Sequence, residues 1–390
     1  MQPNLFSLVL CVFGITTGEF VVAGILPDIA DDLAVSVPAA GLLVTAYAVG
    51  MIVGGPLLTA LTARFRRKPL LLALLVVAVA GNLASALAPL YGLLFAARVV
   101  TAFVTATFFA TAIVAATSAQ PPERQGSTVA KLVLGMNLAM VLGAPLGTVV
   151  GTAYGWRATF AAIAAVCFAG LLLVARWVAD VPGSRYPVTT ELRVFTDRRV
   201  QLAVAVTAVG NTGALMVFTY FAPLLTDIAG FAAGAVPVLL LVYGVGAIAG
   251  NLLGGRIADR ALLSSQPGML VLSALALLLT WVAGGLTGAV AVLVFVLGAV
   301  AFAVVPGMQA RILQTATLAP TLAIAVNASA YQLAAAAAGW LGGRTMDAAG
   351  PGTIYPVAAA VTVAGAVLSG LIWYRERGVA VAPGEVAVGG

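Results

Sequence analysis

Two ionisable side chains lie deep inside long apolar segments, and they are the residues of this sequence best suited to chemistry. Glu19 lies seven residues from one end of the apolar segment 5–26, and Arg98 lies six residues from one end of the segment 92–115. If both segments cross a membrane as helices, both residues lie roughly 10 Å below the same surface. Burying such a charge costs on the order of 2.5–3.5 kcal/mol, so it usually marks a pathway or a partner.

Glu19 and Arg98 allow two interpretations. In the first, Glu19 carries a proton, and a change in its distance from Arg98 exchanges that proton for cargo. In the second, the two residues form a static salt bridge that holds two helices together. We favour the first, because a buried ion pair contributes little stability that apolar packing could not replace.

The composition requires a surface that faces lipid. Hydrophobic residues make up 62% of the 390 positions and charged residues 8%, whereas a soluble domain carries about a quarter charged residues. Strand-type alternation is absent, which disfavours an outer-membrane barrel. The sequence has no histidine, and its two cysteines, Cys11 and Cys167, lie in apolar runs. We therefore expect neither a metal site nor a disulfide.

Apolar runs of the length that spans a bilayer, about 20 residues, recur along the whole chain. They predict an all-α polytopic membrane protein with twelve transmembrane helices in two pseudo-symmetric six-helix bundles. The predicted helices cover 5–26, 39–61, 70–88, 92–115, 128–151, 157–177, 200–222, 236–255, 268–285, 288–308, 322–342 and 353–374. The predicted units are an N-terminal bundle 1–177, a cytoplasmic linker 178–199, a C-terminal bundle 200–378 and a disordered tail 379–390.

The basic residues predict the orientation. With both termini in the cytoplasm, sixteen of the nineteen Lys and Arg residues fall on the cytoplasmic side and two, Arg157 and Arg344, fall outside. The remaining one is Arg98. The net charge of +6 thus follows from membrane topology, and nucleic-acid binding is not needed to explain it.

The two halves of the chain are related by an internal repeat. A shift of 196 positions aligns Gly14 with Gly210, and it also aligns Tyr47, Gly50, Gly54 and Arg64 with Tyr243, Gly246, Gly250 and Arg260. Six helices per half keep both copies in the same orientation. Such parallel repeats place the substrate site between the halves, near the middle of the membrane. The charges are not repeated, since Glu19 aligns with Leu215 and Arg98 with Val294.

Small residues recur at every fourth position in four of the predicted helices. The series are Ala46, Gly50 and Gly54; Gly135, Ala139, Gly143, Gly147 and Gly151; Gly246, Gly250 and Gly254; and Ala330, Ala334, Ala338 and Gly342. This spacing puts them on one face, where helices approach closely. We interpret these faces as the contact between the two halves, with ordinary helix packing as the alternative.

Polar and aromatic residues at membrane depth predict a cavity for a neutral or amphiphilic small molecule. The candidates are Thr16, Tyr47, Thr101, Thr105, Asn137, Asn211, Phe218, Tyr220, Tyr243, Asn327, Tyr331 and Gln332. For any single one of them, packing between helices is the alternative explanation.

Several motifs resemble the major facilitator superfamily, and within it the twelve-helix drug:proton antiporters. The segment Gly55–Lys68 (GPLLTALTARFRRK) is similar to the superfamily's cytoplasmic loop signature, with Ala63 in place of the usual aspartate. Its second copy, Gly250–Arg260 (GNLLGGRIADR), keeps that aspartate as Asp259. The resemblance implies a gating role for Arg64, Asp259 and Arg260 at the cytoplasmic side.

The resemblance extends to the two predicted helices that carry Arg98 and the small-residue series from Gly135 to Gly151. Arg98 in Leu94–Ala102 (LFAARVVTA) occupies the position of the family's helix-four arginine, which implies a role in proton coupling. The segment 135–147, with Gly143, Pro145 and Gly147, is similar to the antiporter motif of helix five. This implies a role in the contact between the bundles.

A narrower resemblance concerns the chloramphenicol-resistance exporters. It is carried by Thr17–Phe20 (TGEF), Leu26–Leu33 (LPDIADDL), Val35–Pro38 (VSVP), Gly155–Arg157 (GWR) and Phe218–Phe231 (FTYFAPLLTDIAGF). The same features are similar, more loosely, to exporters of sugars and purine nucleosides. The resemblance implies a multi-pass protein of the bacterial cytoplasmic membrane.

We therefore expect a secondary transporter that exports drug-like or hydrophobic molecules, such as antibiotics of the chloramphenicol type, in exchange for protons. The alternative is a proton-coupled exporter of a metabolite such as a sugar, purine nucleoside or amino acid. An intramembrane enzyme is disfavoured, because no nucleophile–base pair or metal cluster is visible. We expect no cofactor other than the coupling proton, no use of ATP because no phosphate loop is present, and a monomer in the lipid bilayer.

Overall fold

The computed structural model describes residues 2–62, 64–118, 122–182, 198–315 and 320–380, and the described parts are helical. The first half contains the helices α1 (Pro3–Phe20), α2 (Val22–Asp32), α3 (Val37–Thr62), α4 (Arg67–Ala86), α5 (Tyr91–Thr117), α6 (Pro122–Leu138), the π-helix η1 (Ala139–Gly143), α7 (Ala144–Tyr154) and α8 (Trp156–Trp177). The second half contains α9 (Arg198–Thr219), α10 (Phe221–Pro223), the π-helix η3 (Leu224–Ile228), the short turn η4 (Ala233–Ala235), α11 (Val236–Ala283), α12 (Thr287–Thr315), α13 (Pro320–Ala349), the short turn η5 (Pro351–Thr353) and α14 (Ile354–Ala380).

Eleven stretches within the described residues are long and apolar enough to cross a membrane, and each coincides with a predicted helix. The predicted helix 322–342 lies within α13. Two predicted helices look different in the structure. The first is interrupted at Val21, between α1 and α2, and the helices predicted over 236–255 and 268–285 belong to one assigned helix, α11.

The repeat is visible in the packing as well as in the sequence. Gly50 on α3 lies against Val99 of α5, and its counterpart Gly246 on α11 lies against Phe295 of α12. A Cβ atom on Gly50 would lie 3.0 Å from the carbonyl oxygen of Val99, and one on Gly246 would lie 2.2 Å from that of Phe295. Because the partners are separated by the same 196 positions, the two halves use one packing arrangement twice.

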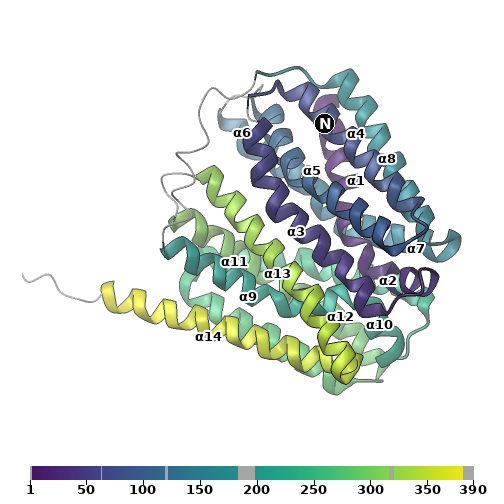
Figure 1. The fold of residues 1–390 in the computed structure, drawn as a ribbon. Helices are drawn as coiled ribbons and strands as arrows, with labels where there is room; N and C mark the ends of the chain where they lie inside the picture. Colours follow the sequence, from purple (N-terminus) through teal and green to yellow (C-terminus); the bar gives the residue numbers. More distant parts are fainter. Residues whose placement is uncertain (1, 63, 119–121, 183–197, 316–319, 381–390) are drawn as a thin grey trace, which may run out of the picture.

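We call the membrane face where α3 ends and α4 begins the linker face, because the start of the segment after α8 contacts it there through Asp180. We call the opposite face the far face. The halves meet through α3 and α13, α7 and α11, and α2 and α10. Figure 1 shows this meeting where α2 and α10 lie, at the lower right. The fifth membrane span consists of α6, η1 and α7. In contrast to α7, α6, which forms the part of this span nearer the linker face, shows no comparable contact with the second half among the described residues.

The far face is closed by short contacts between the halves. Gly41 lies against the hydroxyl group of Tyr220, which a Cβ atom would approach to 2.1 Å, so a larger residue there would displace the Tyr220 ring. The hydroxyl group of Thr45 donates a hydrogen bond to the carbonyl oxygen of Ala336 at 3.0 Å. Pro38 lies against Gly343, where a Cβ atom would come within 3.3 Å of it.

The glycine series pack inside each half, so the prediction that they form the contact between the halves is wrong for this structure. Gly143 lies against Thr17 of α1, and Gly147 lies against Val21 and Thr159. Close packing on four-residue spacing is therefore used here to bring neighbouring helices of one bundle together. The contact between the halves uses a different face of the fifth span, where Val141 lies against Gly244.

Some predictions concern residues that the structure does not describe. These are the side chains of Asp259, Arg260 and Asn327, the whole of Ala63, and the segments 183–197 and 381–390.

Candidate functional site

A pocket lies between the two halves near the middle of the chain's membrane spans. Its cavity volume is about 30 Å³, room for about one water molecule, and it is partly open to the outside. Its lining consists of Glu19, Phe20, Ala23, Val44, Tyr47, Leu215, Phe218, Thr219, Tyr331, Gln332 and Ala335. Four predicted cavity residues, Tyr47, Phe218, Tyr331 and Gln332, are thus brought together with Glu19.

Glu19 binds the second half of the molecule directly. The amide nitrogen Nε2 of Gln332, on α13, donates a hydrogen bond to its carboxyl oxygen Oε1 at 2.8 Å. The two residues are 313 positions apart in the sequence. An acid of the first half is therefore held by an amide of the second half, at the interface that must rearrange if the halves move.

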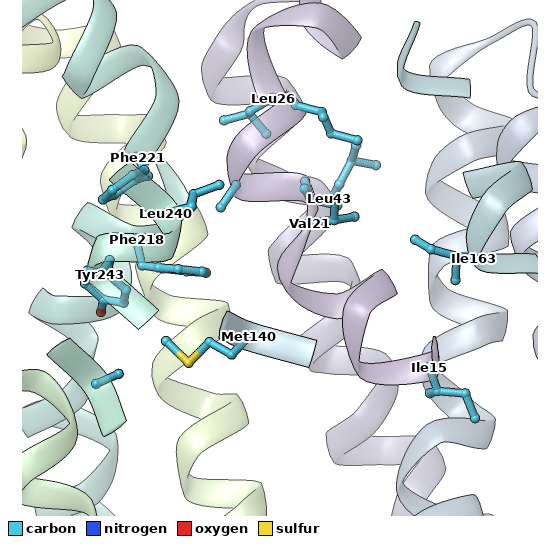
Figure 2. Close-up of a cluster of buried hydrophobic side chains, with 14 of the residues drawn as sticks. Ile15, Val21, Leu26, Leu43, Met140, Ile163, Phe218, Phe221, Leu240 and Tyr243 are labelled. Carbon is cyan, nitrogen blue, oxygen red and sulfur yellow. The ribbon is translucent and has the colours of Figure 1, made fainter. Parts of the chain in front are cut away.

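Aromatic rings form the other side of the pocket. Phe20 of the first half meets Phe218 of the second edge to face, with ring centroids 5.8 Å apart. Phe218 lies 5.3 Å from Tyr243, which also packs against Phe221 at 5.8 Å. Figure 2 shows the rings of Phe218, Phe221 and Tyr243 gathered on the second-half side of the core. Such a wall suits an apolar or aromatic ligand.

Arg98 lies behind the pocket wall. Its side chain is 1% exposed, and its guanidinium carbon lies 4.3 Å from the ring centroid of Tyr47 and 5.6 Å from that of Phe160. None of its three side-chain nitrogens has a hydrogen-bond partner among the described residues. The aromatic faces stabilise the cation, but a buried charge without hydrogen bonds is an unusual and costly arrangement.

Glu19 and Arg98 lie at one level without touching. A Cβ atom on Gly18, the neighbour of Glu19, would lie 3.9 Å from Nη1 of Arg98. The two charges interact electrostatically, yet no ion pair joins them, and the described ion pairs involve other residues. The alternative of a static Glu19–Arg98 salt bridge is therefore wrong for this structure, while the expected common depth is confirmed.

Tyr47 connects the pocket to a row of threonines on α5. Its hydroxyl group shares a hydrogen bond with that of Thr105 at 2.8 Å. The hydroxyl groups of Thr101 and Thr105 also donate to backbone carbonyls one turn earlier, at 2.8 and 3.0 Å. Both threonines lie outside the pocket lining, and Thr105 holds Tyr47 in position.

The other predicted cavity residues that the structure describes lie elsewhere. Thr16 is buried on α1, and Asn211 donates to the carbonyl of Thr207 and to the sulfur of Met308 inside the second half. Tyr220 donates to the carbonyl of Gly339 at 2.7 Å near the far face. Asn137 lines a second space between the halves, closer to the linker face, with Asn251 opposite. Their side chains face packing partners or this second space, and the central pocket lacks them.

Sequence reasoning missed six lining residues: Phe20, Ala23, Val44, Leu215, Thr219 and Ala335. Most are apolar and carry no polar signal. The repeat contained a usable signal, because Leu215 is the counterpart of Glu19 and Thr219 the counterpart of Ala23. Both pairs face one pocket, so the pocket lies on the pseudo-twofold axis between the halves.

Comparisons with known proteins agree with this geometry. A sequence model described as Major Facilitator Superfamily matches residues 8–320. The chain belongs to the major facilitator superfamily. It is 36% identical to the "Inner membrane transport protein YdhP" of Escherichia coli over 94% of this chain and 93% of that protein. It is 35% identical to a "Chloramphenicol resistance protein" of Streptomyces lividans over 86% of this chain and 87% of that protein.

The fold of this facilitator is also found in solved transporters. The crystal structure of a D-xylose–proton symporter superposes with a TM-score of 0.75, covering 94% of this chain and 96% of that chain at 18% identity. At this identity the likeness shows the fold. Membership of the superfamily makes the chain a membrane-spanning transporter, and the pocket lies where parallel repeats place the substrate site.

The fifth span of this facilitator changes its helical type at the motif residues. The π-helix η1 ends at Gly143, directly before Ala144 and Pro145 of α7. Pro145 has no amide hydrogen to donate, so it cannot complete the regular ladder, and a locally wider turn accommodates this. The hydroxyl group of Thr17 would lie 2.1 Å from a Cβ atom on Gly143, so the motif fits this span against α1.

The loop between α3 and α4 has an acidic partner from outside the loop. Nε of Arg66 lies 2.6 Å from Oδ2 of Asp180, and the amide of Arg67 donates to the carbonyl of Val181 at 2.8 Å. Arg64 is exposed at the same face. Asp180 thus places a carboxylate beside a loop in which Ala63 replaces the usual aspartate.

Proposed function

We propose that this facilitator exports drug-like, hydrophobic small molecules in exchange for protons, with Glu19 as the proton carrier. The observation that carries the proposal is the position of Glu19. It is the acidic residue of a pocket between the halves whose other described lining is aromatic, apolar or neutral. A carboxyl group that must be buried at the moving interface is a natural point at which proton binding and conformation are coupled.

The pocket lining supports an apolar cargo. Phe20 and Phe218 offer ring faces and edges from both halves, and Tyr331 and Gln332 offer polar groups that orient a ligand. The similarity to a protein named for chloramphenicol resistance supports the same class of cargo.

We place the linker face in the cytoplasm. Among the described residues, Arg64, Arg66, Arg67, Lys68 and Arg176 lie toward that face, and Arg157 and Arg344 lie toward the far face. The excess of basic residues at cytoplasmic loops supports this orientation. In this orientation the structure is closed toward the outside.

The test is transport by the purified protein in proteoliposomes with an imposed pH gradient, using chloramphenicol and hydrophobic dyes as cargo. We expect concentrative uptake that follows the gradient and is lost in Glu19→Gln, because an amide cannot carry the proton. Exchange of labelled for unlabelled cargo without a gradient should persist in Glu19→Gln, which shows that the fold and the binding site are intact.

Thr219→Val is the matched control, since Thr219 lines the same pocket and does not titrate. It should leave the dependence on the pH gradient unchanged. Gradient-driven accumulation that survives in Glu19→Gln would remove Glu19 from the mechanism. Transport of sugars, nucleosides or amino acids in place of the hydrophobic set would favour the metabolite exporter.

A further inference from the structure

We propose that Gln332 is a positioning residue that holds Glu19 while the far face is closed, and that Glu19 exchanges Gln332 for Arg98 when the halves separate there. The inference rests on the proposed proton-coupled function and deepens it. It names the second-half group that holds Glu19 in the closed arrangement, and it explains why Arg98 is found without a partner.

The hydrogen bond between Glu19 and Gln332 crosses the moving interface. Gln332 lies one helical turn before Ala336, whose carbonyl accepts the hydrogen bond from Thr45 of α3. The same face of α13 therefore makes both contacts with the first half. Any motion that opens the far face draws α13 away from α3, so it also draws Gln332 away from Glu19.

Arg98 behaves differently because it belongs to the same half as Glu19. It stays at the level of Glu19 when the halves move, since α5 packs on α1, α3 and α4. Its guanidinium group is buried and has no hydrogen-bond partner among the described residues. A charged carboxylate is the group that compensates such a cation best, and Glu19 becomes available when Gln332 withdraws.

Tyr47 is positioned to control this exchange. Its ring lies under the guanidinium group of Arg98, and it lines the pocket beside Glu19. The other ionisable group that faces Glu19 across the pocket is Tyr331 of α13. From α9 the pocket receives Leu215 and two further residues that do not titrate. Gln332 is thus the group that donates to Glu19 in this structure, and Arg98 is the cation described at the same level.

The two partners respond to protonation differently. An amide can donate to a carboxylate and accept from a protonated carboxyl group, so Gln332 can hold Glu19 in both forms. A guanidinium group is a donor only, so Arg98 binds the charged form. Loss of the proton therefore favours the Arg98 arrangement and an open far face. Uptake of a proton favours the Gln332 arrangement and a closed far face.

The experiment measures the far-face opening with spin labels on Leu87 of the first half and Leu286 of the second, which are 76% and 67% exposed. Distances between the labels are measured in lipid nanodiscs at pH 6 and pH 8. In the unmodified protein we expect the fraction of molecules with a closed far face to be smaller at pH 8 than at pH 6. In Gln332→Met, which keeps the side-chain size, the closed population at pH 6 should fall about tenfold relative to the open one.

Thr45→Val is the matched control, because it removes another hydrogen bond between the halves without touching Glu19. It should lower the closed population by a similar factor at both pH values and leave the pH response intact. Gln332→Asn, which retains an amide on a shorter side chain, provides a second variant if the methionine variant does not fold. It should also weaken the pH response.

The outcomes separate the two proposals. If Glu19→Leu retains the pH response, proton coupling through Glu19 fails. If Glu19→Leu removes the pH response while Gln332→Met and Gln332→Asn keep it, the proposed function stands and the partner exchange is overturned.

Discussion

The region around Glu19 and Arg98 and its repeat counterpart around Leu215 and Val294 have the same packing but different chemistry. In both halves a glycine of the second span lies against the backbone of the fourth span, at Gly50 and at Gly246. Arg98 and Val294 are both 1% exposed. The comparison teaches that the fold needs the close helix contacts in both copies. The charges of the first half are not required by the packing, which supports a role in transport.

Arg98→Met should give the largest effect in this comparison. Methionine fills a similar volume without a charge, so the melting temperature should be unchanged or higher, because no ion pair is broken. Gradient-driven transport should fall about a hundredfold, the scale on which a positioned proton-transfer group acts. Both quantities are measured on purified protein.

Val294→Ile is the control at the counterpart position, and it should leave transport within about twofold of the unmodified protein, because it adds a single methylene to an apolar site. A result in which Arg98→Met lowers only the protein yield, with full activity per molecule, would show that Arg98 serves the fold.

Gly246→Ala should destabilise the protein more than Gly50→Ala. The added Cβ atom would lie 2.2 Å from the carbonyl oxygen of Phe295, whereas on Gly50 the nearest atom is the Cβ of Ala102 at 2.7 Å. Overpacking of this kind costs about 1–3 kcal/mol, with the larger value where backbone must move. Thermal unfolding in detergent measures the two shifts, and equal shifts would mean that the repeats do not differ in rigidity here.

Tyr47→Phe and Tyr243→Phe compare the hydroxyl groups of two tyrosines that are counterparts in the repeat. Tyr47→Phe removes the hydrogen bond to Thr105 and should lower stability by about 1 kcal/mol. Tyr243→Phe should cost less, since Tyr243 contributes mainly its ring to the cluster with Phe218 and Phe221. Chemical denaturation of the two variants in parallel measures the difference between their free energies of unfolding. A larger loss at Tyr243 would reverse this assignment.

The smallest effect is expected at the far face of the first half, where Asp32 forms an ion pair with Arg157 and accepts a hydrogen bond from Nε1 of Trp156 at 3.2 Å. The hydrogen bond from Arg157 lowers the pKa of Asp32 below its ordinary value. The stability gained is present above the ordinary carboxyl pKa and is lost as the pH falls through the lowered value. The repeat counterpart is Ile228, which cannot titrate.

Asp32→Asn should therefore flatten the acid side of the melting-temperature profile between about pH 5 and pH 2, a range set by ordinary and lowered carboxyl pKa values. Asp227→Asn in the second half, which lies outside this pair, is the control. An unchanged profile in Asp32→Asn would show that the pair contributes nothing to stability.

Most of the fold could be predicted from the sequence, because hydropathy and helix length are local properties. The repeat also follows from aligned residues such as Tyr47 and Tyr243. The partner of each helix face is not local. Four-residue spacing at Gly143 and Gly147 indicates a close contact but not with which helix, so the predicted contact between the halves was assigned to the wrong face.

The site was predictable where a residue is both deep and polar. Glu19, Tyr47 and Gln332 meet in one pocket. Thr101 and Thr105 satisfy the same criterion, but their hydroxyl groups bind their own helix backbone, which composition does not reveal. The hydrogen bond from Gln332 to Glu19 joins residues far apart in sequence. Its prediction would have required knowledge of how α13 packs on the first half.

The single acid of the pocket limits how steeply cargo can be concentrated. Within the eleven described spans Glu19 is the one carboxyl group, so the proposed cycle carries at most one proton. A membrane voltage of about 100 mV supplies roughly 2.3 kcal/mol per charge, and a difference of one pH unit supplies about 1.4 kcal/mol. For an uncharged cargo their sum sustains a ratio of roughly 500 between the two compartments. With a second acid at the position of Leu215, the maximum concentration ratio would be the square of this value, provided that both protons moved in every turnover.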